Sequence, residues 1–331
     1  MTQLDRRLVL TAPIAMAALA ATRPAAALPA APVPFHEPTE TIPLWTGTVP
    51  GNLRPGVLLK EVNETVPLDK DIPTRRISKV SRPRMSVFPG QQPNGASVLI
   101  IPGGGFAYGY YDHEGYDLAY ELAQQGITCF VLFYRLANDG WENRPDIGTI
   151  DAQRAMRVIR ANASRFKLDP ERVAVIGFSA GGYIAGSLAT RHAQPLYSAA
   201  DQTDQLSARP NLAGLMYSVL SLDPAIAWNG AAPSLFGGTP TDAQIMTYAP
   251  DHNVSSTTPA TFLAQADDDN TVPPENSLRF RAALRAAGIP SETHLFVSGG
   301  HGFGMKRRPA EPYHIWPTLF VNFARHQGLF A

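Results

Sequence analysis

The sequence predicts an α/β protein whose core is a mostly parallel, doubly wound sheet flanked by helices. From Arg84 onward, short runs of β-forming residues alternate with longer segments that carry apolar residues at helical spacing, as in parallel strands joined by crossover helices. Several runs, such as 98–101 and 173–176, are apolar throughout, which suits strands covered on both faces. The expected strands cover residues 84–88, 97–102, 127–134, 172–178, 212–220, 260–266 and 291–297. The expected helices cover residues 115–126, 147–166, 180–192 and 275–288.

Composition indicates a globular protein with no bias toward a charged partner. The chain has 331 residues, of which 44% are hydrophobic, so it can bury a sizeable core, and the disordered and fibrous classes are excluded. Lysine plus arginine and aspartate plus glutamate are equal at 28 each. Because no net charge attracts nucleic acid or an anionic surface, we expect a small or neutral molecule as the partner and no nucleic acid. No oligomeric state is indicated.

The first 27 residues are predicted to be an export signal that is cleaved from the mature protein. Arg6 and Arg7 precede an apolar run over residues 8–21, and alanines at 25–27 match the small-residue cleavage pattern. The run of 14 residues is too short to span a bilayer of roughly 30 Å, which needs about 20 helical residues. The paired arginines favour a twin-arginine signal, with an ordinary secretory signal as the alternative. We therefore expect a periplasmic or secreted protein without stable membrane insertion.

The rest of the chain is expected to divide into a proline-rich arm over residues 28–80 and a main domain over residues 81–331. The arm has little periodicity, so it is predicted to lie extended on the main domain or to be partly disordered. Residues 221–258 interrupt the alternation with glycines and prolines and are predicted to form a small insertion over the functional edge of the sheet. Cys129 is the only cysteine, which excludes an intramolecular disulfide, and we expect it to be buried and inert.

A G-x-S-x-G pattern places a candidate nucleophile at Ser179. The sequence Gly177-Phe178-Ser179-Ala180-Gly181 follows an apolar strand and opens a helical segment, the context that gives this pattern its catalytic meaning. The serine must occupy a strained turn, and its small neighbours let the chain approach itself closely. The helix start directs the Ala180 amide at the site, so Ala180 is one candidate donor to the oxyanion of a tetrahedral intermediate. The alternative is a glycine-rich helix start that matches by chance.

Glycines after an earlier strand supply a second candidate oxyanion donor. Gly103, Gly104 and Gly105 follow the strand expected over 97–102. Gly104 and Gly105 are the candidates, because glycine lets a backbone amide approach the acyl oxygen with no Cβ in the way. A dinucleotide-binding loop is excluded, since Tyr108 stands where its third glycine belongs. With no phosphate-binding G-K-[ST] loop either, no cofactor is expected, and a plain turn stays the alternative.

An acid and a base are expected after the nucleophile, in that order. Asp267, Asp268 and Asp269 follow a predicted strand. Asp269 is the predicted acid because Asp-x-x-Val-Pro resembles the acid loop of many hydrolases; its two neighbours and a solvated acidic turn stay as alternatives. His301 lies among four glycines after the last predicted strand, where core packing does not explain it, and it is the predicted base. EF-hand and H-E-x-x-H patterns are absent from the sequence, so no metal site is expected.

From about residue 84 to the C-terminus, these motifs resemble the acetyl-xylan-esterase-like and feruloyl-esterase-like branch of the α/β hydrolases. The resemblance implies an α/β-hydrolase fold and deacetylation of carbohydrate esters without a cofactor, often outside the cytoplasm. Pro102 departs from the histidine of H-G-G-G in the related lipase branch, which leaves the backbone donors intact. The motifs, in matching order and spacing, are Pro102-Gly103-Gly104-Gly105-Phe106, Tyr134-Arg135-Leu136, Asp151-Ala152-Gln153-Arg154-Ala155, Gly177-Phe178-Ser179-Ala180-Gly181-Gly182, Ala266 to Pro273 with Glu275-Asn276-Ser277, and Gly299-Gly300-His301-Gly302-Phe303.

The chain is therefore predicted to be a serine esterase. Asp269 orients His301, His301 takes the proton of Ser179, and Ser179 attacks an ester carbonyl to form an acyl-enzyme that water resolves. A serine peptidase or amidase is one alternative, because fold and triad do not select the leaving group. A noncatalytic binding protein with this fold is the other; it would be expected to lack a triad residue, and none is missing.

Overall fold

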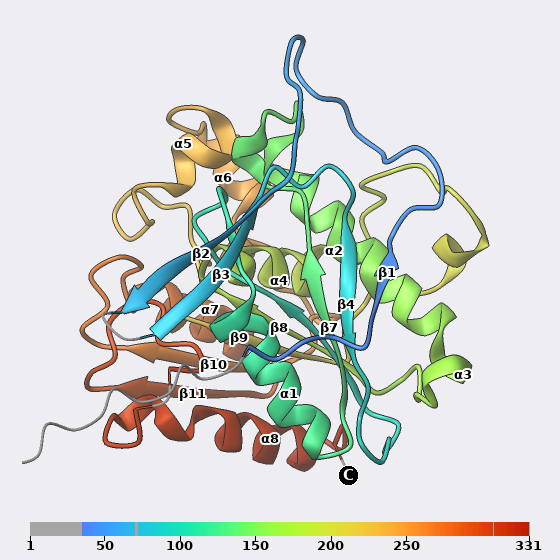
Figure 1. Cartoon of the computed structure of the whole chain (residues 1–331). Coiled ribbons are helices and arrows are strands. Elements are labelled where there is room, and N and C mark those ends of the chain that lie inside the picture. The colour runs from blue at the N-terminus through green and yellow to red at the C-terminus, as the bar shows by residue number, and fades with distance from the viewer. Residues whose placement is uncertain (1–34, 70–71, 307, 331) are drawn as a thin grey trace, which may run out of the picture. The chain divides into compact units, whose positions relative to one another are not determined.

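A central sheet of eight strands organises the part of the chain that the computed structural model describes, residues 35–69, 72–306 and 308–330 (Figure 1). The five neighbouring pairs from β7 to β11 are parallel. At the other edge, β4 is antiparallel to both of its neighbours, β1 and β7. The predicted, mostly parallel α/β fold is thereby confirmed. In spatial order the strands are β1 (Glu40–Pro43), β4 (Arg84–Phe88), β7 (Thr128–Phe133), β5 (Ser97–Ile101), β8 (Val173–Phe178), β9 (Leu212–Met216), β10 (Ala260–Ala266) and β11 (Ser291–Phe296).

Helices cover both faces of this sheet, as the apolar strands require. Leu99 and Ile101 of β5 belong to the buried cluster that includes residues of α2, α4 and α7, whereas Val98 and Ile100 belong to the cluster that includes residues of α1 and α8. All four are fully buried. The helices and helical turns are η1 (Asp112–Tyr116), α1 (Asp117–Gln124), η2 (Ala137–Asp139), α2 (Arg144–Ala161), α3 (Ala163–Phe166), α4 (Ser179–Arg191), η3 (Gln202–Gln205), α5 (Ala231–Phe236), α6 (Asp242–Tyr248), η4 (Pro250–His252), α7 (Glu275–Ala286), η5 (Pro312–Ile315) and α8 (Trp316–His326).

Several elements differ from the sequence-based expectation. The strand expected over 212–220 ends at Met216, because the next residue, Tyr217, has a left-handed backbone (φ +38°) that breaks the extended conformation. The helix expected over 115–126 begins at Asp117, after the π-helix η1. Helix α8 was not expected, although Pro317 in its first turn is a helix-start signal.

The described part of the arm expected over residues 28–80 forms strands. Strand β1 pairs with β4 at the edge of the main sheet. Strands β2 (Val62–Asp69) and β3 (Ile72–Ser78) form an antiparallel hairpin that pairs with β6 (Gly109–Tyr110) in a second sheet (Figure 1). The predicted export signal lies outside the described residues. Among the described helices, none has the length and apolar character needed to cross a bilayer.

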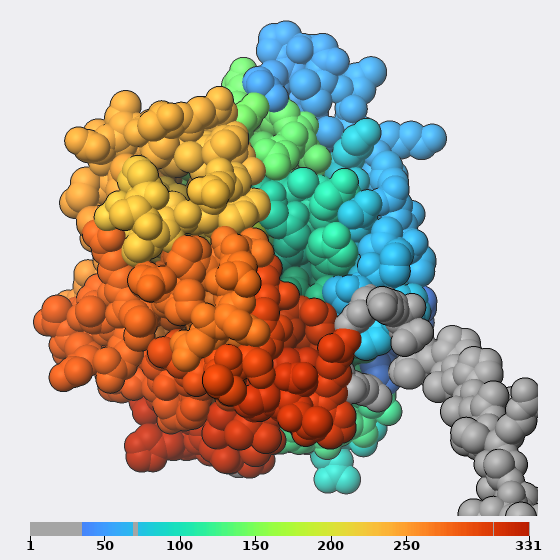
Figure 2. Space-filling model, turned by 90° about the vertical axis from the view of Figure 1, so that its left-hand side faces the viewer, coloured from blue at the N-terminus to red at the C-terminus, as the bar shows by residue number. Residues whose placement is uncertain are grey.

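The segment expected as an insertion, residues 221–258, carries two short helices, α5 and α6. Asn276 of α7 fixes the start of this segment. Its side-chain oxygen accepts from the Leu220 amide at 3.0 Å, and its side-chain nitrogen donates to the Ile226 carbonyl at 2.7 Å. Figure 2 shows the insertion, coloured yellow to orange, packed beside the orange and red C-terminal third of the chain.

A buried ion pair joins the end of β7 to α2. Arg135 and Asp151 are fully buried, and the guanidinium donates to the carboxylate from Nη2 at 2.7 Å and from Nε at 2.9 Å. Trp45 donates its indole N–H to the same carboxylate at 3.3 Å, which ties the segment after β1 to this point. Because both charged groups are removed from water, each charge is stabilised by the opposite charge of its partner.

Asp151→Ala is expected to lower the free energy of unfolding by about 3–5 kcal/mol, because it leaves the Arg135 charge buried and unpaired. Urea unfolding followed by circular dichroism measures the loss. Glu64→Ala is the control. It breaks a surface pair with Arg76 in which the Glu64 side chain is 44% exposed, and it should cost less than about 1 kcal/mol. Equal losses in the two variants would contradict the assignment of Arg135 and Asp151 as a stabilising pair.

Candidate active site

Ser179 lies at a sharp turn between β8 and α4. Its backbone is left-handed, with φ +52°, a strained conformation for a residue with a side chain. The neighbouring glycines are sterically required. A Cβ on Gly177 would lie 2.5 Å from the Gly181 carbonyl oxygen, and one on Gly181 would lie 2.3 Å from the Ile101 carbonyl oxygen. The spacing of glycines around the serine is thus explained by the close approach of α4 to β5 and β8.

Three side chains from the ends of different strands are in contact. The Ser179 Oγ atom lies 2.8 Å from Nε2 of His301, and Nδ1 of His301 lies 2.8 Å from Oδ2 of Asp269. With the imidazole proton on Nδ1 donated to the carboxylate, Nε2 is free to accept the serine proton. The structure therefore brings together the predicted nucleophile, base and acid in the arrangement that activates a serine hydroxyl.

Of the three described aspartates in the acid loop, Asp269 is the one whose carboxylate contacts the imidazole. It is buried, and its Oδ1 atom accepts from the Thr271 and Val272 amides, both at 2.9 Å. Asp268 instead accepts from the Gly300 amide at 2.7 Å, and Asp267 is exposed. The backbone thus fixes Asp269 in place, while Asp268 helps to hold the histidine loop.

The three candidate oxyanion donors belong to the two turns that adjoin Ser179. Gly104, with φ +139°, and Gly105, with φ +62°, form a turn that a side chain would obstruct, since a Cβ on Gly104 would lie 2.3 Å from the Tyr108 carbonyl oxygen. Among the described residues, neither glycine amide has a hydrogen-bond acceptor. The Ala180 amide belongs to the first turn of α4, where helical acceptors are missing. All three amides are thus free to bind a negative oxygen.

A cavity of about 390 Å³ opens beside Ser179 and His301. The β2–β3 hairpin, the glycine loop and the insertion each contribute to its walls. The Trp228 ring of the insertion lies 3.2 Å from where a Cβ on Gly105 would be, so it narrows the space next to the candidate oxyanion donors. The lining residues include Pro67, Leu68, Gly104, Gly105, Tyr108, Tyr110, Trp228 and Thr271.

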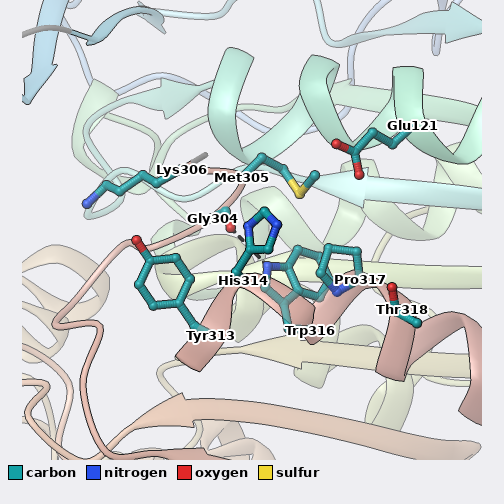
Figure 3. Close-up of a pocket in the computed structure, with 9 residues that line it drawn as sticks. All are labelled: Glu121, Gly304, Met305, Lys306, Tyr313, His314, Trp316, Pro317 and Thr318. Carbon is teal, nitrogen blue, oxygen red and sulfur yellow. Dashed lines mark hydrogen bonds between the residues drawn. The ribbon is translucent and has the colours of Figure 1, made fainter. Parts of the chain in front are cut away.

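The loop after His301 is held by hydrogen bonds on several sides. The Gly304 amide donates to the Tyr217 hydroxyl at 3.0 Å, and its carbonyl accepts from the Trp316 indole at 2.9 Å (Figure 3). The Met305 amide donates to the carbonyl of His113 at 2.8 Å. Gly304, Met305 and Lys306 of this loop also line a second cavity, of about 160 Å³, and Figure 3 labels the residues around it. The base is therefore carried by a loop fixed to α8, η1 and the residue after β9.

Two residues of this site, Glu114 and Tyr217, were not predicted from the sequence. Both are buried, and the Tyr217 hydroxyl donates to Oε1 of Glu114 at 2.7 Å. Burial, and then the Glu114 charge, raise the pKa of Tyr217 well above its ordinary value. The available signal was an acidic residue, Glu114, directly before the helix expected over 115–126. Among the described residues, no group of three or more histidine, cysteine or acidic side chains is placed to hold a metal ion.

Comparisons with known proteins agree with this geometry. The pattern of the prolyl oligopeptidase family matches residues 120–316. Endo-1,4-beta-xylanase B of Butyrivibrio fibrisolvens is 33% identical over 205 residues, covering 62% of this chain and 32% of that protein. Acetylxylan esterase of Xylanibacter ruminicola is 29% identical over 235 residues, covering 70% and 46%. The chain thus spans less than half the length of either relative.

A solved structure is similar over nearly the whole described chain. The acetyl ester-xyloside bifunctional hydrolase from Caldicellulosiruptor lactoaceticus has a TM-score of 0.69 and 28% sequence identity, and the match covers 89% of this chain and 99% of that one. The likeness therefore extends beyond the segment that the family pattern matches.

Asp269→Asn is expected to lower kcat for an activated ester by about 10⁴-fold, because the amide no longer favours the imidazole tautomer that accepts the serine proton. Asp267→Asn is the matched control and should stay near the wild-type rate, since Asp267 is exposed to solvent. Steady-state kinetics with p-nitrophenyl acetate measures both. A wild-type rate for Asp269→Asn would remove that residue from the triad.

Proposed function

This chain belongs to the prolyl oligopeptidase family, and from that premise we propose that it is a serine carboxylic-ester hydrolase that removes acetyl groups from carbohydrate esters. The observation that carries the proposal is the pair of 2.8 Å contacts that links Ser179, His301 and Asp269. These contacts lie beside free backbone amides and an open cavity. That combination provides a nucleophile, a base and a site for developing negative charge, which acyl transfer requires.

The reaction follows from the positions of these groups. His301 takes the Ser179 proton while the serine oxygen bonds to the ester carbonyl carbon, and the amides of Ala180 and the Gly104–Gly105 turn bind the resulting oxyanion. The imidazolium then gives its proton to the departing sugar oxygen as the ester bond breaks. Water attacks the acyl-enzyme by the same route, releases the acid and restores the serine hydroxyl.

The cavity walls support a small acyl group on a carbohydrate. The Trp228 ring lies against Gly105, beside the candidate oxyanion donors, and this position favours a short acyl group over a long chain. Tyr108 and Tyr110 also line the cavity, and such aromatic side chains offer flat apolar surfaces with a polar edge to a sugar ring. The names of the acetylxylan esterase and acetyl ester-xyloside hydrolase relatives agree with this substrate class.

The second candidate function is hydrolysis of a peptide or another amide. The family's name, prolyl oligopeptidase, favours it, and the same triad serves both kinds of leaving group. Restricted space beside Gly105 and the two carbohydrate-esterase relatives favour the ester. A noncatalytic role is disfavoured because the serine, the acid and the base are all in contact.

We also propose that the protein acts in the periplasm or is secreted after removal of residues 1–27. Arg6 and Arg7 before an apolar run support twin-arginine export. An enzyme encounters polymeric carbohydrate esters outside the cytoplasm, so this location agrees with the proposed substrate.

The wild-type enzyme is expected to release acetate from acetylated xylo-oligosaccharides. Among p-nitrophenyl esters, it should prefer acetate over octanoate by at least about tenfold in kcat/KM, because one excess methylene group in a small pocket costs about 1–3 kcal/mol. Ser179→Ala is the control and should lose on the order of 10⁴-fold in turnover or more. Faster cleavage of a prolyl peptide, or a preference for octanoate, would overturn the acetyl-esterase assignment.

A further inference from the structure

A buried carboxylate outside the triad connects the two loops on which the proposed reaction depends. Glu114 is 3% exposed and borders the cavity beside Ser179. Its Oε2 atom accepts from the Gly103 amide at 2.9 Å, and its Oε1 atom accepts from the Tyr217 hydroxyl at 2.7 Å. The bond to Gly103 fixes the residue directly before the candidate oxyanion donors.

Tyr217 extends this connection to the histidine loop. Its hydroxyl oxygen accepts from the Gly304 amide at 3.0 Å, and its ring packs edge-on against the His301 imidazole, with ring centres 5.2 Å apart. A single carboxylate is therefore bonded directly to the oxyanion loop and, through one hydroxyl, to the loop that carries the base.

Titratable groups face Glu114 from several elements. His301 and Lys306 come from the histidine loop, Tyr217 from the end of β9, and His113 from η1 itself, with Nε2 3.8 Å from the carboxylate. The pKa of Glu114 is raised overall by its burial, although its hydrogen bonds and the charges of His301 and Lys306 act in the opposite direction. Burial and the Lys306 charge lower the pKa of His113 to about 3, so His113 is neutral. When Glu114 is ionised, its charge thus acts on His301 and Lys306.

The β2–β3 hairpin holds the segment that carries Glu114. Within the π-helix η1, Glu114 leaves helical geometry, with φ −112° and ψ 16°, and π-helical turns are frequent at functional sites. Arg75 of β3 binds the adjacent Asp112 with its guanidinium at 2.8 Å and its amide at 2.6 Å. Thr74 lies 3.1 Å from Nδ1 of His113. The residues on the N-terminal side of Glu114 are thus fixed by side chains from another sheet.

We propose that Glu114 is a positioning residue that holds the oxyanion loop and the His301 loop in one geometry and stabilises the imidazolium formed when His301 takes the Ser179 proton. The inference rests on the proposed serine-hydrolase function. It assigns a role to a buried charge that the triad chemistry leaves unused. It also gives a reason for burying a carboxylate beside the base despite the free-energy cost of its desolvation.

Glu114→Gln tests this role, because it keeps the shape and removes the charge. With p-nitrophenyl acetate, kcat is expected to fall about 10- to 100-fold, with KM little changed. The acid limb of the kcat/KM profile should move to lower pH, since an imidazolium that loses a neighbouring negative charge is harder to form. Tyr217→Phe breaks the link and keeps the charge, so it should lower kcat and leave the acid limb in place.

Asp146→Asn is the matched control. Asp146 is also a buried carboxylate, but it pairs with Arg191 at 2.9 Å at the far end of α4 from Ser179. This variant should lower Tm without changing the acid limb. If Glu114→Gln lowers Tm in the same way and keeps the wild-type profile, its role is structural and the proposal is wrong. If Glu114→Gln does not fold, a wild-type kcat in Tyr217→Phe overturns the proposed link.

A substrate-independent measurement separates this inference from the proposed function. A fluorophosphonate probe reacts with an activated serine, whose oxygen bonds to phosphorus as fluoride leaves. If the wild-type protein is labelled at Ser179 but hydrolyses no ester, the esterase assignment fails, and the labelling rate alone then decides the role of Glu114. Labelling at least about tenfold slower in Glu114→Gln supports the proposal, and an equal rate in the variant and the wild type overturns it.

Discussion

The parallel sheet is the constraint on which the site depends, because parallel strands bring their carboxyl ends to one edge. Strand β8 ends at Ser179, β10 leads into the loop of Asp269, and β11 leads into the loop of His301. The glycine loop follows β5, and Tyr217 follows β9. Residues more than 100 positions apart in sequence thus meet without any local signal between them.

Buried charges then turn this proximity into a fixed geometry. Asp269 is held by the amides of its own loop, whereas Glu114 is held by groups from two other loops. Each carboxylate is satisfied by donors that would otherwise lack acceptors, which offsets the free-energy cost of burial. The same logic applies in the core, where Arg135 and Asp151 join β7 to α2. Loops that carry no regular structure are made rigid in this way.

The sequence predicted what depends on local pattern and left out what depends on tertiary contacts. Ser179 and His301 stand in short motifs with strong steric requirements, and the apolar runs identified the parallel strands. The choice among three adjacent aspartates rested on motif resemblance, and the contact of Asp269 with His301 depends on how two loops pack. The roles of Glu114 and Tyr217 were not foreseen because their partners, Gly103 and Gly304, lie in other parts of the chain.

The residues of the site lie partly inside and partly outside the segment that the family pattern matches. Ser179, Asp269 and His301 all fall within the segment 120–316 that the family pattern matches. Gly104, Glu114 and the hairpin precede that segment. They form one cavity wall and the contacts that hold the oxyanion loop. The matched segment thus contains the three side chains in contact, whereas part of the cavity wall comes from residues that precede it.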